Sequence, residues 1–149
     1  MSLWEFRATV APMGPRAIAK DVIHDGDTVK LLIDQGFEGR AEKWIRLAGV
    51  SAPEISEPGG STCRAFVIGW LDKRAQVPGG PPPVLSRLRW PLRVVTDKTQ
   101  AIEPIQVQSF TRYVGWIYDL ATGESLNEQV NALLAEHPEW PPGRDILHG

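Results

Sequence analysis

The sequence contains only one cysteine, Cys63, among its 149 residues. A single thiol excludes an internal disulfide and a zinc site built from several cysteines. The sequence also lacks an apolar run of the ~18 residues that a membrane-spanning helix needs, and its first residues lack the basic and apolar regions of a signal peptide. We therefore expect no membrane partner and, by default, an intracellular location.

Positive charge is not in excess either. The chain carries 16 Lys and Arg against 18 Asp and Glu, a formal net charge of −2. This balance argues against a protein that coats nucleic acid with a broad basic surface, and it leaves open an enzyme that holds one phosphate with two arginines. The length suits one domain with a good core and is too short for two ordinary domains. We expect residues 1–149 to form a single domain with an irregular tail at about 138–149.

The most informative residues lie in two stretches, 22–29 and 45–54. The first contains a tight Asp25-Gly26 turn that leads into a β-rich segment. The second is a strand that stops at Gly49 and continues as a loop carrying Pro53-Glu54. Each stretch therefore places acidic side chains at the end of a strand.

A hairpin connection over residues 34–39, with two glycines, joins these stretches. Because a hairpin brings its outer ends together, we expect Asp27 to lie beside the loop that carries Glu54, with Arg46 nearby. Two acids and an arginine at one end of a hairpin are the groups that phosphodiester chemistry on a metal needs.

Hydrophobic periodicity predicts a mainly β, α+β fold: a small closed barrel of five strands with two helices. The strands are expected at Trp4–Met13, Thr28–Ile33, Glu42–Ala48, within Leu85–Asp97 with a continuation at Ile102–Gln108, and at Arg112–Tyr118.

The first helix is expected to begin at a cap on Ser61 or Thr62 and to end near Ala75. Its apolar stripe should face the core, and Gly69, which costs about 1 kcal/mol relative to alanine in a helix, should mark close packing on the sheet. A capping box over Ser125–Glu128 opens the second helix, which ends before Pro138.

Three motifs in this order resemble those of the staphylococcal nuclease-like (thermonuclease) family. They are the D-G-D-T-V turn at Asp25–Val29, the segment Arg46–Glu54, and the strand Arg112–Tyr118 that opens with an arginine. The resemblance, which covers roughly Phe6 to His137, implies an OB-fold barrel. One position differs, because Ser51 stands where the family usually has a second metal-binding aspartate.

The resemblance implies roles for individual residues. Asp27 would bind calcium together with the backbone carbonyl of Ala52, and the neutral hydroxyl of Ser51 would replace a carboxylate in that set. Glu54 would act as the general base that takes a proton from the attacking water. Arg46 and Arg112 would hold the phosphate and stabilise its developing charge. Each residue also has an ordinary reading, as a turn, loop or strand-surface residue.

Two aromatic residues beside these motifs, Phe110 and Tyr113, are candidates for stacking on a base of the substrate. Aromatic side chains on strands are more often part of the core, so this role has a simpler alternative.

Three functions are compatible with the sequence. The first is a calcium-dependent nuclease that hydrolyses phosphodiester bonds of DNA or RNA, which the retained Glu54 favours. The second is a catalytically weakened OB-fold module that binds nucleic acid, which Ser51 favours. The third is a structural or assembly protein whose barrel and proline-rich segments contact other proteins.

Overall fold

The structure is a computed structural model that describes residues 3–12, 14, 16–80, 89–97, 102–104 and 111–143. No helix in these ranges is long and apolar enough to cross a membrane. In chain order, the elements are β1 (Leu3–Val10), the short 3₁₀ helix η1 (Ala19–Asp21), β2 (Ile23–Asp25), β3 (Thr28–Gly36), β4 (Gly39–Leu47), α1 (Gly60–Asp72), β5 (Leu92–Asp97), β6 (Ile102–Pro104), β7 (Thr111–Asp119) and α2 (Leu126–Ala135).

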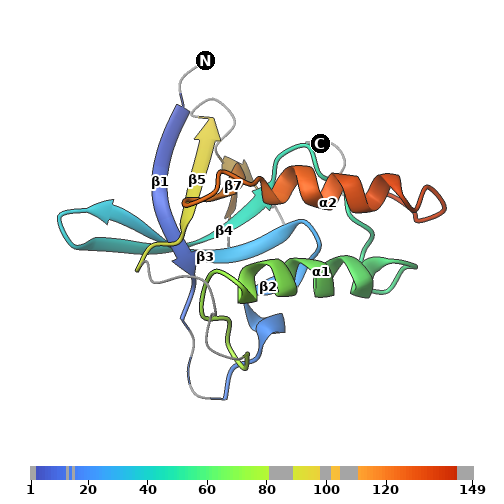
Figure 1. Cartoon of the computed structure of the whole chain (residues 1–149), viewed down its shortest axis with the longest axis horizontal. Helices are drawn as coiled ribbons and strands as arrows, with labels where there is room; N and C mark the ends of the chain where they lie inside the picture. The colour runs from blue at the N-terminus through green and yellow to red at the C-terminus, as the bar shows by residue number, and fades with distance from the viewer. Residues whose placement is uncertain are drawn as a thin grey trace.

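Five of these strands close into a barrel (Figure 1). β1 pairs antiparallel with both β3 and β5, β5 pairs antiparallel with β7, and β3 pairs antiparallel with β4. β4 and β7 run parallel, so the order β1-β5-β7-β4-β3 returns to β1. The two short strands β2 and β6 add to β3 and β7. The predicted fold class, a mainly β OB-fold-like barrel with two helices, is confirmed.

The strands of the central hairpin are longer than the sequence pattern predicts. β3 continues to Gly36 and β4 begins at Gly39, because the chain turns on only two residues, Phe37 and Glu38. Both have positive φ, 53° and 67°, the conformation that a two-residue hairpin turn requires. The predicted strand segments at 85–88 and 105–108 lie outside the described residues.

The two helices lie side by side against the barrel (Figure 1). The predicted apolar stripe of α1 is confirmed, since Cys63, Val67, Trp70 and Leu71 are buried and Phe66 packs at the edge of the core. α2 contributes Leu126 and Val130 to the same core. The inward faces of the strands complete that core, so the barrel and both helices share it.

Two expectations about α1 are wrong. The helix begins at Gly60 after an N-cap at Gly59 in the left-handed conformation (φ 85°), and not at a hydroxyl cap on Ser61 or Thr62. Gly69 does not mark close packing, because a Cβ built on it would meet no atom within 4 Å. The N-cap of α2 is as predicted: the side chain of Ser125 accepts a hydrogen bond from the backbone N–H of Glu128 (3.1 Å).

A buried amide fastens α2 to the barrel. Asn127, which is 3% exposed, donates from Nδ2 to the carbonyl oxygens of Ala48 (3.0 Å) and Gly115 (3.1 Å). Its Oδ1 accepts from the backbone N–H of Ile117 (3.0 Å). One side chain therefore satisfies three buried backbone groups, at the end of β4 and along β7, and this sets where α2 starts.

Replacing Asn127 with alanine should lower the free energy of unfolding by about 2–4 kcal/mol, because it leaves buried backbone groups without partners. Asn131→Ala is a matched control on the same helix: Asn131 is exposed and makes one hydrogen bond, to the carbonyl of Gly49 (3.1 Å). We expect a loss of at most about 0.5 kcal/mol there. Urea unfolding measures both, and equal losses would contradict the role assigned to Asn127.

A second polar cluster joins the end of α1 to the turn between β7 and α2. The guanidinium of Arg74 donates to Asp119 (2.7 Å), to Glu124 (2.6 Å) and to the carbonyl of Trp70 (2.8 Å), and it stacks 3.8 Å from the centre of the Trp70 ring. Burial alone would raise the pKa of Asp119. The hydrogen bonds from Arg74 and from the N–H groups of Ala121 and Thr122, with the positive charge of Arg74, outweigh burial and hold that pKa below its ordinary value.

Because the folded-state pKa of Asp119 is lowered, its contribution to stability is present above the ordinary carboxyl pKa and is lost as the pH falls through the folded pKa. Asp119→Asn should therefore lower the free energy of unfolding by about 1.5–3 kcal/mol at pH 7, and by progressively less below about pH 4. Unfolding free energies measured from pH 7 to pH 2.5 test this. The control is Asp34→Asn on the hairpin. If Asp119→Asn lowers the free energy of unfolding by the same amount at every pH, the stabilising role assigned to the charge of Asp119 is wrong.

Candidate functional site

The candidate site forms where β2 turns into β3. Asp25 and Asp27 flank Gly26, and Oδ1 of Asp25 accepts a hydrogen bond from the backbone N–H of Asp27 (3.1 Å). A Cβ on Gly26 would lie 2.6 Å from Cβ of Cys63 and 2.9 Å from Cβ of Ala52. Only glycine fits there, because the turn packs directly against α1 and against the 51–54 loop.

Asp27 links this turn to the second motif. Its carbonyl oxygen accepts from the backbone N–H of Leu47 (2.7 Å), and its Oδ2 accepts from the backbone N–H of Ala52 (3.2 Å). Its Oδ1 accepts from the hydroxyl of Thr28 (3.1 Å), and the residue is only 2% exposed. The predicted meeting of Asp27 with the 51–54 loop is therefore confirmed, through a hydrogen bond between residues 25 positions apart.

Arg46 lies on the neighbouring strand, in register with Thr28, and is fully buried (0% exposed). Its Nη1 donates to the carbonyl of Leu47 at 3.5 Å. A buried guanidinium beside a buried carboxylate turn keeps a fixed positive charge at this end of the barrel. In the described conformation, this arginine has no surface in contact with solvent.

Glu54 lies two residues after Ala52 and is partly buried. Its backbone carbonyl accepts from the N–H of Glu57 (2.9 Å), and a Cβ on Gly60 would overlap that carbonyl. The loop after Glu54 is thus a compact turn pressed against the start of α1. This packing fixes the backbone that carries Glu54 relative to Ala52 and Asp27.

The third motif is on β7, beside β4. The structure describes the backbone of Arg112, which pairs with Trp44 two residues before Arg46, and does not describe its side chain. Tyr113 is partly buried and lines a cavity at the other end of the barrel, away from Asp27. Phe110 lies outside the described residues.

The electrostatics of the site are reported by Cys63, which is fully buried in α1. The pKa of its thiol is raised to about 11, chiefly by burial and also by the negative charges of Asp27 and Asp25. Two carboxylates therefore lie close enough to Cys63 to act on its thiol, and the positive charge of Arg46 lies on the neighbouring strand.

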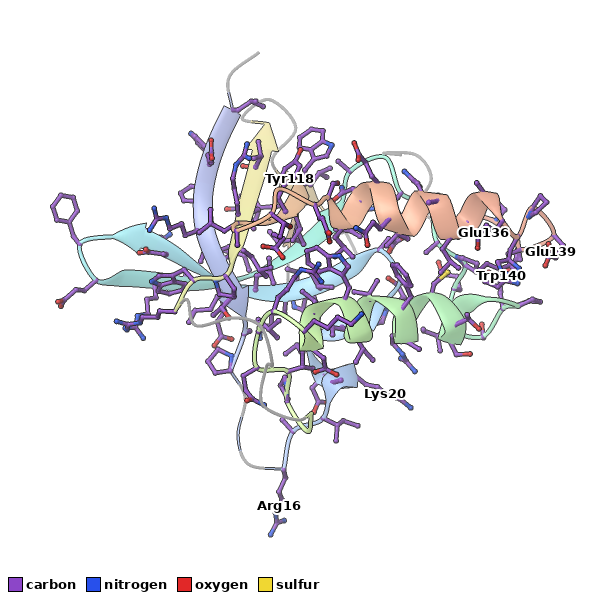
Figure 2. All side chains as sticks on the ribbon, viewed as in Figure 1. Arg16, Lys20, Tyr118, Glu136, Glu139 and Trp140 are labelled. Atoms are coloured by element: carbon purple, nitrogen blue, oxygen red, sulfur yellow. The ribbon has the colours of Figure 1, made fainter. Side chains whose placement is uncertain are left out.

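The segment after α2 covers this site. Figure 2 shows Trp140 between the ends of α1 and α2, beside Glu139. Its ring stacks on that of His137, with centroids 3.9 Å apart, and a Cβ on Gly59 would overlap it. Three residues later, a Cβ on Gly143 would overlap the carbonyl oxygen of Ala52 and lie 3.6 Å from Oδ2 of Asp27. Gly143 is buried and helps to shield Asp27 from solvent.

The donors at this site are oxygens, the ligands of a hard cation. They are the carboxylate of Asp27, the carbonyl of Ala52 and the hydroxyl of Ser51, whose Oγ is buried and has no hydrogen-bond partner among the described residues. Within those residues, no three His, Cys, Asp or Glu side chains are grouped to hold a metal. These oxygens are of the type that a hard cation takes, but only one of them belongs to a carboxylate, whereas calcium sites usually have several.

A scan of the sequence against models of known protein families finds no match. A search of curated proteins finds no match either.

The sequence patterns did not predict that residues 140–143, the closing segment, cover the site, because Trp140 and Gly143 lie in a predicted irregular tail. The described part of that tail, residues 138–143, contains no helix or strand. The available signal was a tryptophan between prolines, which indicates an anchored rather than a freely solvated chain end. It could not show which residues Trp140 contacts.

Gly143→Ala should displace the closing segment, since the added methyl group overlaps the carbonyl of Ala52. We expect a loss of about 1–3 kcal/mol in unfolding free energy, together with a shift of the indole N–H resonance of Trp140. Gly69→Ala, which meets no atom within 4 Å, serves as the control and should leave that resonance unchanged. An unshifted indole signal in Gly143→Ala would show that the segment does not rest on Ala52.

Proposed function

We propose that this protein is a cation-assisted phosphodiesterase of the staphylococcal nuclease-like class, acting on DNA or RNA. The observation that carries the proposal is the hydrogen bond from the N–H of Ala52 to Oδ2 of Asp27 (3.2 Å). It joins two of the three motifs at one end of the barrel. A buried arginine, Arg46, is in register with Thr28 on the neighbouring strand, and Glu54, the proposed base, follows Ala52 by two residues.

Each group has a role in the proposed reaction. Asp27, the carbonyl of Ala52 and the hydroxyl of Ser51 would hold the divalent cation, which supplies charge neutralisation at the phosphate. Glu54 accepts a proton from the attacking water. Arg46 and Arg112 donate hydrogen bonds to the phosphate oxygens as negative charge builds on them.

The closing segment sets a condition on this activity. Gly143 packs on Ala52 and lies near Asp27, which is 2% exposed, so in the proposed reaction residues 140–143 move away before a phosphate reaches Asp27. The proposed enzyme therefore works from an opened conformation, and its rate includes the cost of opening.

A second candidate function is an OB-fold module that binds nucleic acid without cleaving it. The observation in its favour is the single carboxylate among the three proposed cation ligands. Because Ser51 is neutral, the site holds a cation less firmly than a site with two aspartates would.

The test is cleavage of single-stranded DNA and RNA by purified protein at mildly alkaline pH with excess calcium or manganese, against chelator. Glu54→Gln should lower the rate by at least about 100-fold, because it removes the base and keeps the shape of the side chain. Glu57→Gln in the same loop is the matched control and should cut normally. If chelator and Glu54→Gln both leave cleavage unchanged, the proposal is wrong.

Ser51→Asp separates the two candidates. For an enzyme weakened by the missing carboxylate, it should lower the cation concentration needed for half-maximal cleavage by roughly 10- to 100-fold. Calorimetric titration of calcium measures the same gain without turnover. A protein that binds single strands yet cuts them neither as wild type nor as Ser51→Asp is the binding module.

A further inference from the structure

Among the described residues, side chains do not fill the end of the barrel opposite the candidate site. A cavity of about 250 Å³ lies there, where β3 ends and where β4 and β7 begin. All five barrel strands contribute inward-facing side chains to it, among them Phe6, Ile33, Lys43, Val94 and Tyr113. Barrel mouths are among the places where small ligands bind in proteins.

The inner end of this cavity is formed by the hydrophobic core. Ile33, Ile45 and Val94, which are 5%, 2% and 0% exposed, line it. Nearer the opening, the rings of Phe6 and Tyr113 are only partly buried and pack against that core. A ligand in this space would meet an apolar surface at the bottom and aromatic rings at the side.

Polar side chains from Gln35, Thr96 and Lys43 interrupt the apolar lining, and the last two are the groups that we assign to a ligand. Thr96 is 4% exposed, and its Oγ1 is buried without a hydrogen-bond partner among the described residues. A buried hydroxyl without a partner is costly, and a ligand atom that bonds to it removes that cost. The second group is Lys43, whose Nζ lies 5.6 Å from the centre of the Tyr113 ring. Lys43 faces inward from β4 and forms no salt bridge with any described residue.

From these groups we infer that the barrel mouth binds a small planar aromatic acid, with its ring between the apolar floor and the rings of Phe6 and Tyr113. The acid group faces the ammonium of Lys43, and one polar atom bonds to the hydroxyl of Thr96. This site is independent of the proposed nuclease function, because it shares no residue with the Asp27 site.

The size of the cavity limits the ligand to one or two rings. An apolar cavity of about 150 Å³ accommodates benzene, so 250 Å³ accommodates a bicyclic ring with a short polar arm. Among the described residues that line the cavity, Lys43 is the one cation and has no carboxylate partner, and such an ammonium attracts an anion. A nonplanar ring of the same volume would lose its stacking on the aromatic walls.

The experiment is titration of the full chain with 1-naphthoate, followed by ¹H–¹⁵N correlation spectra. Two comparison compounds are 1-naphthalenemethanol, which lacks the charge, and cyclohexanecarboxylate, which lacks the planar ring. We expect saturable shifts at Val94 and Thr96 with 1-naphthoate, none at Asp27, and at least a several-fold weaker affinity for either comparison compound.

Two substitutions test the polar contacts separately. Lys43→Met keeps the long side chain. It should lower the affinity for 1-naphthoate by roughly 2- to 5-fold and leave the affinity for 1-naphthalenemethanol unchanged. Thr96→Val should lower the affinity for both naphthalene compounds. It should not lower the thermal midpoint of unfolding, because it removes a buried hydroxyl that has no partner among the described residues. The unchanged midpoint serves as the folding control.

Three results would overturn the inference. They are the absence of saturable shifts with any compound, shifts centred away from Val94 and Thr96, and equal affinity for the acid and the alcohol in wild type. Activity on nucleic acid has no bearing on this test. The proposed phosphodiesterase function and the proposed ligand site are therefore tested independently.

Discussion

The carboxylate of Asp27 is the point on which this structure depends. A buried charge is expensive unless hydrogen bonds satisfy it, and here the N–H of Ala52 and the hydroxyl of Thr28 do so. The carbonyl of the same residue pairs with Leu47 at the end of β4. One residue therefore ties the β2–β3 turn to β4 and to the loop that carries Glu54. The same bonds that stabilise the fold hold the groups proposed for chemistry.

The two ends of the barrel differ in character, because the inward-facing residues change along each strand. Toward Asp27, the barrel is covered by α1, by the 51–54 loop and by residues 140–143. Toward Tyr113, described residues line a cavity whose walls are mostly aromatic and aliphatic. A small barrel can thus carry a charged site at one mouth and an apolar site at the other, with the shared core between them.

Much of the fold follows from local sequence patterns. The alternation along the strands, the apolar stripe from Cys63 to Leu71 and the N-cap at Ser125 each have a single physical reading, and the structure agrees with them. The meeting of Asp27 with Ala52 was also predictable, since a hairpin brings its ends together. The patterns could not show that Asn127 turns inward, because an asparagine on a helix is usually solvated.

Other features depend on contacts that no local pattern encodes. The left-handed cap at Gly59 depends on Trp140, whose ring occupies the space that a side chain would need. Gly143 is required by the carbonyl of Ala52, some ninety positions earlier. The burial of Arg46 likewise follows from how the elements close around it, and strand alternation alone predicts a surface position. Such long-range constraints become visible only when the chain is folded.

The central claim is that a divalent cation binds between Asp27 and Ala52. Paramagnetic broadening by Mn²⁺ tests it most directly, because manganese takes the same oxygen ligands and erases amide signals near its site. We expect the amide signals of Gly26, Asp27 and Ala52 to disappear first at substoichiometric Mn²⁺, and Ser51→Asp to sharpen this selectivity. Broadening that begins at exposed carboxylates such as Glu139, with the Asp27 turn unaffected, would contradict it.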